Sequence, residues 1–345
     1  MRYFGIILLV VFFFSCSEES GKNSDDFSYL PEAVGGYSTV NIIADQPLWD
    51  NGLKAHVQPV FERQIEGLLN PETEFDITTV RSKVFNRLFK RQRALLIFVT
   101  SKKVSQEGVS VKKNVYADGQ IVVQLAAKTS DAAITLFKNK KDEIFQVIDH
   151  HRTTMIQKLA RKKNNDQLED RLLNNHGIGM IIPKSYRLGM DSLNFFYAFK
   201  QGEMKCEKFN HKNCYYQTGV FSYFFNYTDQ GIFTPEKFIA LRDSVTKIYI
   251  EGKTTRDSVR SYMQVYKDFP VATKNITING QFAYEVKGWW DMKNGTMGGP
   301  FVSVATVDEM RNRVIVTDAF VFGPNFNKRR FIKELEAICL STKGF

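Results

Sequence analysis

Apolar residues recur every three or four positions in some stretches of the chain and form alternating or continuous runs in others. The first pattern is typical of helices and the second of strands. In the first half of the chain, strands are predicted at residues 38–44, 75–80, 94–100, 109–116 and 120–127. Helices are predicted at 53–68, at 84–89 and from Asp131 onward, where Phe137 starts a long apolar stripe. Because strands and helices interleave, residues 29–163 are predicted to form an α/β sandwich domain.

The second half contains many predicted strands and only two predicted helices. The strands are expected at residues 178–182, 193–200, 218–227, 271–278, 281–290, 301–307 and 313–322. One helix should begin at Pro235, after the N-cap residue Thr234, and the other should cover residues 328–340. Residues 177–345 are therefore predicted to form an α+β domain, a second sandwich whose mainly antiparallel sheet is covered by helices on one face. Residues 164–176, with an Asn pair at each end, are the predicted connector.

The N-terminus has the pattern of an export signal. Arg2 precedes an unbroken apolar run over residues 6–14, which is too short to span a bilayer and which ends at Ser15-Cys16. Residues 1–15 are therefore predicted to be a signal peptide, and the polar residues 16–28 a tether. The junction Phe13-Phe14-Ser15-Cys16 resembles a bacterial lipobox, which implies lipidation of Cys16 and anchorage in a lipid bilayer. An ordinary secretory signal with an incidental cysteine is the alternative.

Several segments near the C-terminus carry a family resemblance. They are Gly288-Trp289-Trp290-Asp291, Met297-Gly298-Gly299-Pro300-Phe301, the strand through Asp318, and the basic start of the last helix, Lys328-Arg329-Arg330. Together they resemble a family of Bacteroidetes lipoproteins known only as a domain of unknown function. The resemblance implies an outer-membrane address in the cell envelope and no particular activity. Ser17-Glu18-Glu19 is similar to a signal for export to the cell surface, and a location facing the periplasm stays equally open.

The chain is basic, with 47 Lys and Arg against 37 Asp and Glu and a net charge of +10. Such an excess often indicates nucleic acid as a partner, but the predicted location outside the cytoplasm argues against it. The charge then favours anionic lipid headgroups, envelope polymers or a simple solvated surface. Lys158, Arg161, Lys162 and Lys163 lie together at the end of the long predicted helix. Their charge suits the helix dipole, and contact with a membrane or an anionic polymer is the alternative interpretation.

The cysteines predict one crosslink. Cys206 and Cys214 flank a polar stretch between two strand-like runs, and an oxidising compartment would allow them to close a hairpin loop as a disulfide. Two alternatives stay open, namely two free thiols and a metal site completed by His211. Cys339 follows the apolar spacing of the last helix and is predicted to be a buried thiol.

The segment from Gly288 to Phe301 is the predicted binding surface. Strand alternation places Trp290 on the core side and Trp289 among charged residues. The loop from Asp291 to Pro300 is expected to fold back over Trp289, with its glycines adopting backbone angles closed to other residues. The proposed binding residues are Trp289, Asp291, Met297, Gly298, Gly299, Pro300 and Asp318.

Asp318 interrupts an apolar strand, so it should be hydrogen-bonded to backbone N–H groups of the glycine-rich loop or should serve as a ligand or acid. The sequence contains no HExxH, GxSxG or P-loop motif, and no catalytic residue, metal ligand or cofactor is predicted. Asp149-His150-His151 falls on a predicted helix, where it indicates a polar helix surface. A non-enzymatic envelope lipoprotein that binds a polymer or a partner protein is therefore favoured. The alternative is an envelope hydrolase that uses Asp291 and Asp318.

Overall fold

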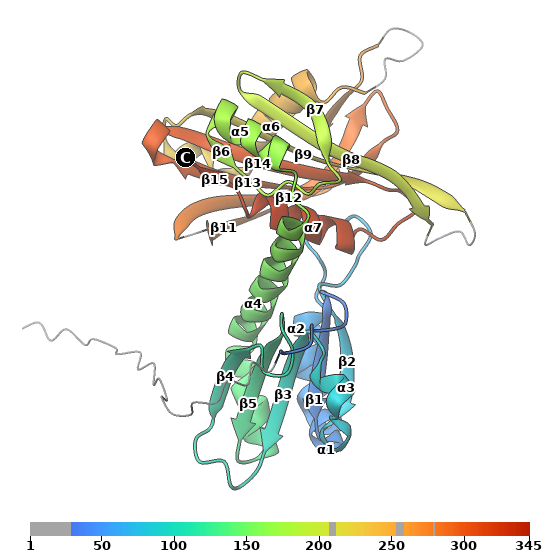
Figure 1. Cartoon of the computed structure of the whole chain (residues 1–345), viewed down its shortest axis with the longest axis vertical. Helices are drawn as coiled ribbons and strands as arrows, with labels where there is room; N and C mark the ends of the chain where they lie inside the picture. Colours follow the sequence, from blue (N-terminus) through green and yellow to red (C-terminus); the bar gives the residue numbers. More distant parts are fainter. Residues whose placement is uncertain (1–28, 207–211, 253–258, 279) are drawn as a thin grey trace, which may run out of the picture.

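The computed structural model describes residues 29–206, 212–252, 259–278 and 280–345. The predicted signal peptide, Cys16 with the tether, and His211 lie outside these residues. Two bodies, each built on its own sheet, are connected by α4 (Ser130–Lys162), a helix of 33 residues. Figure 1 shows α4 running from the lower body to the upper one, where its end lies beside α7 (Arg329–Cys339).

The lower body is a five-stranded sheet in the order β2-β1-β3-β5-β4, with all strands parallel except β4. Its strands are β1 (Thr39–Ala44), β2 (Asp76–Arg81), β3 (Ala94–Thr100), β4 (Gly108–Lys113) and β5 (Ile121–Ala127). One face packs against α2 (Lys54–Phe61) and α4 through buried residues such as Phe61 and Phe137. Before α2 lie a short helix, α1 (Gln46–Leu48), and a π-helical turn over Trp49–Leu53. The predicted interleaved α/β order is confirmed.

The predicted helix over residues 53–68 is too long, because α2 ends at Phe61. The chain then turns back so that Gln64 forms a β-bridge with Thr73, and Gly67 adopts a left-handed φ of +81°. A Cβ atom at Gly67 would lie 2.9 Å from the backbone N of Gly288 in the upper body. The apolar residues Ile65 and Leu68 therefore complete the core of the upper body rather than a helix of the lower one.

The predicted helix over residues 84–89 is replaced by two shorter elements. They are a 3-10 turn at Ser82–Val84 and the single-turn helix α3 (Arg87–Lys90), whose first turn is capped by the Asn86 side chain. Phe85 and Phe89 of this segment pack on the second face of the lower sheet. The short segment is thus a thin cover over an apolar sheet face.

The upper body is a curled, antiparallel sheet in the order β10-β12-β13-β14-β9-β8-β7, with β11 also paired to β12. Its strands are β7 (Arg187–Ser192), β8 (Phe195–Lys205), β9 (Asn213–Asn226), β10 (Tyr262–Val265), β11 (Ala272–Ile278), β12 (Gln281–Lys293), β13 (Gly298–Asp308) and β14 (Arg313–Phe322). Short 3-10 turns lie at Gln230–Ile232 and Glu309–Arg311. The connector forms α5 (Asp166–His176), and beyond it β6 (Ile178–Gly179) pairs with β15 (Lys343–Gly344).

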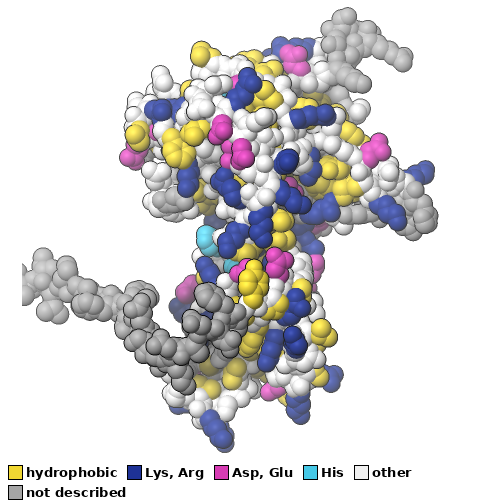
Figure 2. All heavy atoms as spheres, viewed as in Figure 1, with side chains coloured by type: hydrophobic (Ala, Val, Ile, Leu, Met, Phe, Trp, Pro, Cys, Tyr) yellow, Lys and Arg dark blue, Asp and Glu magenta, His cyan; other side chains and the backbone are white. Residues whose placement is uncertain are grey.

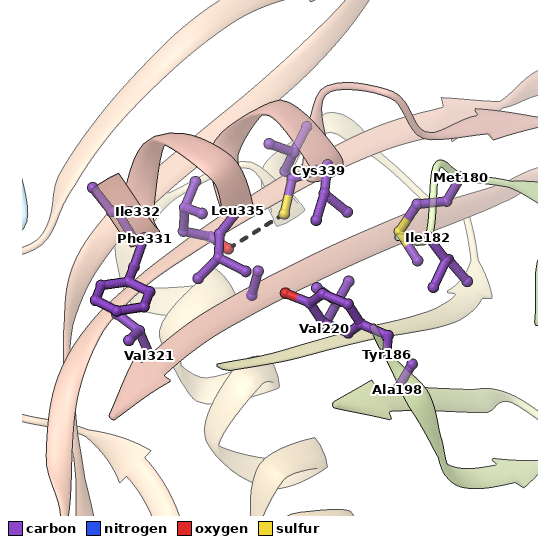
Figure 3. Packing of buried hydrophobic residues seen from close by; sticks show 14 of the residues in the cluster. Met180, Ile182, Tyr186, Ala198, Val220, Val321, Phe331, Ile332, Leu335 and Cys339 are labelled. Atoms are coloured by element: carbon purple, nitrogen blue, oxygen red, sulfur yellow. Dashed lines mark hydrogen bonds between the residues drawn. The ribbon is translucent and has the colours of Figure 1, made fainter. Parts of the chain in front are cut away.

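Helices cover both faces of the upper sheet, whereas the sequence predicted cover on one face. The helix α6 (Pro235–Tyr249) packs on the face that carries Trp290 and Phe320, and α7 packs on the opposite face. Figure 3 shows Phe331, Leu335 and Cys339 of α7 directed at this second face, near Val321 and Val220. The thiol of Cys339 is fully buried, as predicted, and burial raises its pKa.

Candidate functional site

Seven charged side chains form a continuous row across the junction of the two bodies, with alternating signs. In order they are Asp149, Arg152, Glu74, Lys333, Glu336, Lys287 and Glu285. The first three belong to the lower body and its helix α4, and the other four to α7 and β12. Lys333 is the central link, because its Nζ lies 2.8 Å from Oε2 of Glu74 and 2.9 Å from Oε2 of Glu336. We call these seven residues the junction row.

The junction row shifts the pKa values of its members because the charges are buried and closely spaced. Burial raises the pKa of Glu74, but the charges of Lys333 and Arg152 outweigh this effect and hold it below its ordinary value. Burial also raises the pKa of the Glu336 carboxyl, but the charges of Lys287 and Lys333 outweigh this effect and hold that pKa below its ordinary value. Both carboxylates are therefore ionised at neutral pH and bind the bodies together electrostatically.

Directional hydrogen bonds fix the same junction. The carboxylate of Glu72 accepts hydrogen bonds from the backbone N of Lys328, at 2.6 Å, and of Arg329, at 2.7 Å. It thereby satisfies N–H groups at the start of α7 that lack a partner within the helix. Arg329 also binds Asp76 with both guanidinium Nη atoms, and Gln157 of α4 donates to the carbonyl of Ala337. The two bodies are thus held in one defined arrangement.

A cavity of about 830 Å³ opens beside the junction row. Its walls come from five parts of the chain, namely residues 36–39 up to the start of β1, Asp76 at the start of β2, the end of α4 with Lys163, residues 183–185 and the first half of α7. Ile156, Leu159 and Ala160 of α4 supply an apolar wall, and Leu159 is 47% exposed. We call this cavity the junction cleft.

The rim of the junction cleft carries an excess of positive charge. Among the lining residues, Arg329 is neutralised by Asp76 and Lys333 by carboxylates of the junction row. Lys163, Lys184 and Arg330 also line the cleft, and none of them forms an ion pair with any residue that the structure describes. In Figure 2, Lys and Arg side chains gather where the two bodies meet. The cleft therefore combines an apolar wall with three uncompensated cations.

The segment predicted to bind a partner is a β-hairpin instead of a folded-back loop. β12 continues to Lys293, and Trp289 lies opposite Pro300 in the register of β12 and β13. Asn294, with a φ of +58°, takes the left-handed position of the turn, while Gly298 and Gly299 lie within strand β13 and keep negative φ. The predicted loop over Trp289, with glycines in unusual backbone angles, is therefore wrong.

The hairpin glycines instead make room for neighbouring atoms. A Cβ atom at Gly299 would lie only 1.9 Å from the carbonyl oxygen of Val321, so no larger residue fits there. Gly298 lies against the indole of Trp289, since its Cβ would be 3.3 Å from Nε1. Trp290 is buried as predicted, and Trp289 is half-buried. Met297 packs at the edge of the core on the α6 side. A binding role for this hairpin stays a prediction.

Asp318 is fully buried and is bound by the side chain of a helix instead of by the glycine-rich segment. Arg242 of α6 donates from Nε, at 2.7 Å, and from Nη2, at 3.2 Å, and Ser303 Oγ also donates to this carboxylate. With 0% exposure, Asp318 cannot meet a substrate from solvent. Asp291 is half-buried, and its Oδ1 has no hydrogen-bond partner among the described residues. The two carboxylates therefore provide no open acid–base pair.

Cys206 and Cys214 form a disulfide at the tip of the β8–β9 hairpin, with their Cα atoms 5.2 Å apart. Both residues are accordingly committed to the crosslink in this structure. Among the described residues no cluster of three or more His, Cys, Asp or Glu side chains has the geometry of a metal site. His211, the third ligand of the alternative, lies outside them.

Sequence reasoning missed both the junction row and the cleft. Asp149-His150-His151 was expected to be polar helix surface, yet His151 is 4% exposed and the next residue, Arg152, is 2% exposed. The reason is that loops of the lower body cover these positions, since His151 contacts Gly119 and Arg152 binds Glu74. His151 Nε2 lies 3.3 Å from the carbonyl oxygen of Gly119, and burial lowers the pKa of this imidazole. The sequence signal for the junction row was the pair of charged residues Lys333 and Glu336 beside the apolar stripe of the last helix.

Separate family models match the two bodies of the chain. A family model described as a domain of unknown function (DUF4837) matches residues 165–341, slightly more than half of the chain. The chain belongs to this family. A second family model, also a domain of unknown function (DUF8532), matches residues 33–161. No curated protein matches the chain.

Two solved structures that match the chain are distant from it in sequence. The Ran-binding protein Mog1p of Saccharomyces cerevisiae is 9% identical, with a TM-score of 0.29, and the match covers 49% of this chain and 90% of that protein. A protein from Bacteroides thetaiotaomicron VPI-5482 is 10% identical, with a TM-score of 0.22, over 49% of this chain and 45% of that one. Such values carry no information on what this chain binds. No helix within the described residues combines the length and the apolar character needed to cross a membrane.

Proposed function

We propose that this protein is a lipoprotein of the cell envelope, anchored through Cys16, that binds an amphipathic anion in the junction cleft without catalysing a reaction. The observation that carries the binding role is the cleft itself, in which an apolar wall faces three uncompensated cations. Its volume of about 830 Å³ lies within the range of roughly 300–1,000 Å³ common for small-molecule sites. The envelope address is supported by the lipobox-like junction and the acidic start of the tether.

The lining of the cleft favours an elongated ligand with one anionic end. The side chains of Ile156 and Leu159 can bury an acyl chain, which is stabilised by removal of apolar area from water. Lys163, Lys184 and Arg330 can then hold a carboxylate or phosphate at the rim. An envelope lipid, or the acyl end of an envelope polymer, has this combination of groups.

Binding without catalysis is favoured by the identity of the lining side chains. Among the described residues that line the cleft there is neither His nor Cys to act as a base or nucleophile. Its acidic members are engaged, since Asp76 pairs with Arg329 and Glu334 lies 3.9 Å from Lys200. The carboxylates are therefore occupied, whereas the three rim cations, which form no ion pair with a described residue, can bind a ligand.

The cleft can be tested with cis-parinaric acid, a fluorescent fatty-acid anion. The paired change Lys163→Glu and Lys184→Glu should weaken binding about tenfold or more, which corresponds to at least about 1.4 kcal/mol. The matched control is Lys158→Glu with Lys162→Glu, which changes the net charge by the same amount. Both control residues lie near Lys163 at the end of α4, but neither lines the cleft. The control should bind within about twofold of the wild type. Equal weakening in both variants would show that only net charge matters and would remove the cleft from the proposal.

Anchorage is tested separately by labelling cells with an alkyne fatty acid. The wild-type chain should be tagged, and Cys16→Ser should not be, because the thiol that accepts the lipid is gone. Equal labelling of both proteins would refute the lipoprotein assignment and would leave the cleft proposal intact.

A further inference from the structure

Among the described residues, the second face of the lower sheet is covered by the segment over residues 82–90 and by Tyr116. Phe85 and Phe89 point toward the sheet and pack with Leu95, Ile97 and other buried residues. The opposite side of the same segment is left to solvent, where Leu88 is 75% exposed and Val84 is 50% exposed. Two apolar side chains thus project outward from a layer whose inner side is already packed.

Basic residues are frequent in this part of the chain. Residues 81–113 contain ten Lys and Arg and one acidic residue, Glu107. Lys83 and Arg87 lie on the covering segment, both exposed and neither in an ion pair with any described residue. Lys112 of β4 is also exposed and lies opposite Val122, whose side chain belongs to the same sheet face. We call Lys83, Val84, Arg87, Leu88 and Lys112 the α3 face.

The polypeptide that leads to the tether runs beside the continuation of this segment. The backbone N of Val34 donates to the carbonyl of Arg91, and the N of Arg93 donates to the carbonyl of Val34, both at 2.9 Å. Arg91 also donates from Nη2 to the carbonyl of Glu32. A chain attached to lipid at Cys16 can place Tyr29, thirteen residues further on, at most roughly 47 Å from the bilayer, because a fully extended residue spans at most about 3.6 Å.

We propose that the α3 face docks on the surface of an anionic lipid bilayer. Exposed Leu and Val within a ring of Lys and Arg are the pattern of an interfacial contact, in which apolar side chains enter the headgroup region and cations bind lipid phosphates. A soluble anionic polymer would explain the cations and not the exposed Leu88. The contact is distinct from the junction cleft, and together with the anchor at Cys16 it would give the lower body a defined orientation on the membrane.

The test uses residues 17–345, which lack both the apolar run over residues 6–14 and the lipid-accepting Cys16, with sedimentation on vesicles. The protein should bind vesicles that contain phosphatidylglycerol more tightly than vesicles of phosphatidylcholine alone, and the difference should shrink at high salt. Lys83→Glu with Arg87→Glu should weaken binding to the anionic vesicles by about tenfold or more, since each basic side chain at such a surface strengthens binding roughly fivefold. Leu88→Ser should weaken binding several-fold without changing its salt dependence.

The matched control is Lys138→Glu with Lys141→Glu, which makes the same change in net charge on α4, the layer on the other side of the sheet. This control should bind anionic vesicles within about twofold of the parent chain. Equal loss in both paired variants, or equal binding to the two kinds of vesicle, would overturn the proposal. So would binding to dextran sulfate that competes fully with the vesicles and is unaffected by Leu88→Ser, because that result identifies a polymer-binding surface.

Discussion

Replacing Lys333 by Met should lower the free energy of unfolding, because it weakens the junction between the two bodies. The Lys333 side chain is 6% exposed, and its ammonium lies within 3.0 Å of both oxygens of Glu74 and 2.9 Å from Glu336. Removing one partner of a buried ion pair costs about 3–5 kcal/mol, because the other charge stays buried. Glu74 keeps Arg152 and Glu336 keeps Lys287, so the expected loss lies near about 3 kcal/mol.

The matched control is Lys140→Met. Lys140 pairs with Glu143 at the same i,i+3 spacing on a helix, but the two side chains are 45% and 68% exposed. Loss of such an exposed pair should cost no more than about 0.5 kcal/mol. Urea unfolding, followed by fluorescence, gives both values from the midpoint and slope. The reasoning is refuted if the two variants are destabilised equally, since burial is then without effect.

The same contact predicts a dependence of stability on pH. The pKa of Glu74 is below its ordinary value of 4.5 in the folded state, so its stabilisation is complete above that value and is lost as the pH falls through the lowered one. Glu336, whose pKa is also lowered, acts in the same direction. The midpoint temperature of thermal unfolding of the wild type should therefore decrease as the pH is lowered from about 5 to about 3. Glu74→Gln should flatten that fall, and an unchanged profile would contradict the assignment.

Four further variants test the upper body. Asp318→Asn should destabilise it by about 3–5 kcal/mol in urea, because the buried guanidinium of α6 loses its counter-charge; a loss below about 1 kcal/mol would show that the pair is dispensable. Trp290→Ala should cost about 3–5 kcal/mol as a core truncation, whereas Trp289→Ala, at a half-buried position, should cost clearly less in the same assay. The paired change Cys206→Ser and Cys214→Ser should remove about 2–3 kcal/mol in the chain-entropy model, and alkylation of both thiols in the unreduced wild type would argue against the crosslink.

Local periodicity determined much of this protein before any tertiary contact is considered. β3 and β14 begin and end where their apolar runs do, and α6 begins at Pro235 behind Thr234 as its capping residues require. The burial of Trp290 also follows from strand alternation. These features depend on residues within one or two turns of each other, so the sequence contains them directly.

Tertiary structure alone decided which charges meet and where the cleft opens. Lys333 and Glu74 are 259 positions apart, and Arg242 and Asp318 are 76 apart, so no spacing rule could pair them. The chain after Phe61 carries a helical apolar pattern, yet Ile65 and Leu68 leave the helix because the other body offers them a core. The junction cleft is lined by five separate segments, and its charge depends on which cations the junction has already neutralised. Long-range packing sets these features because a buried charge must find a counter-charge wherever the fold brings one near.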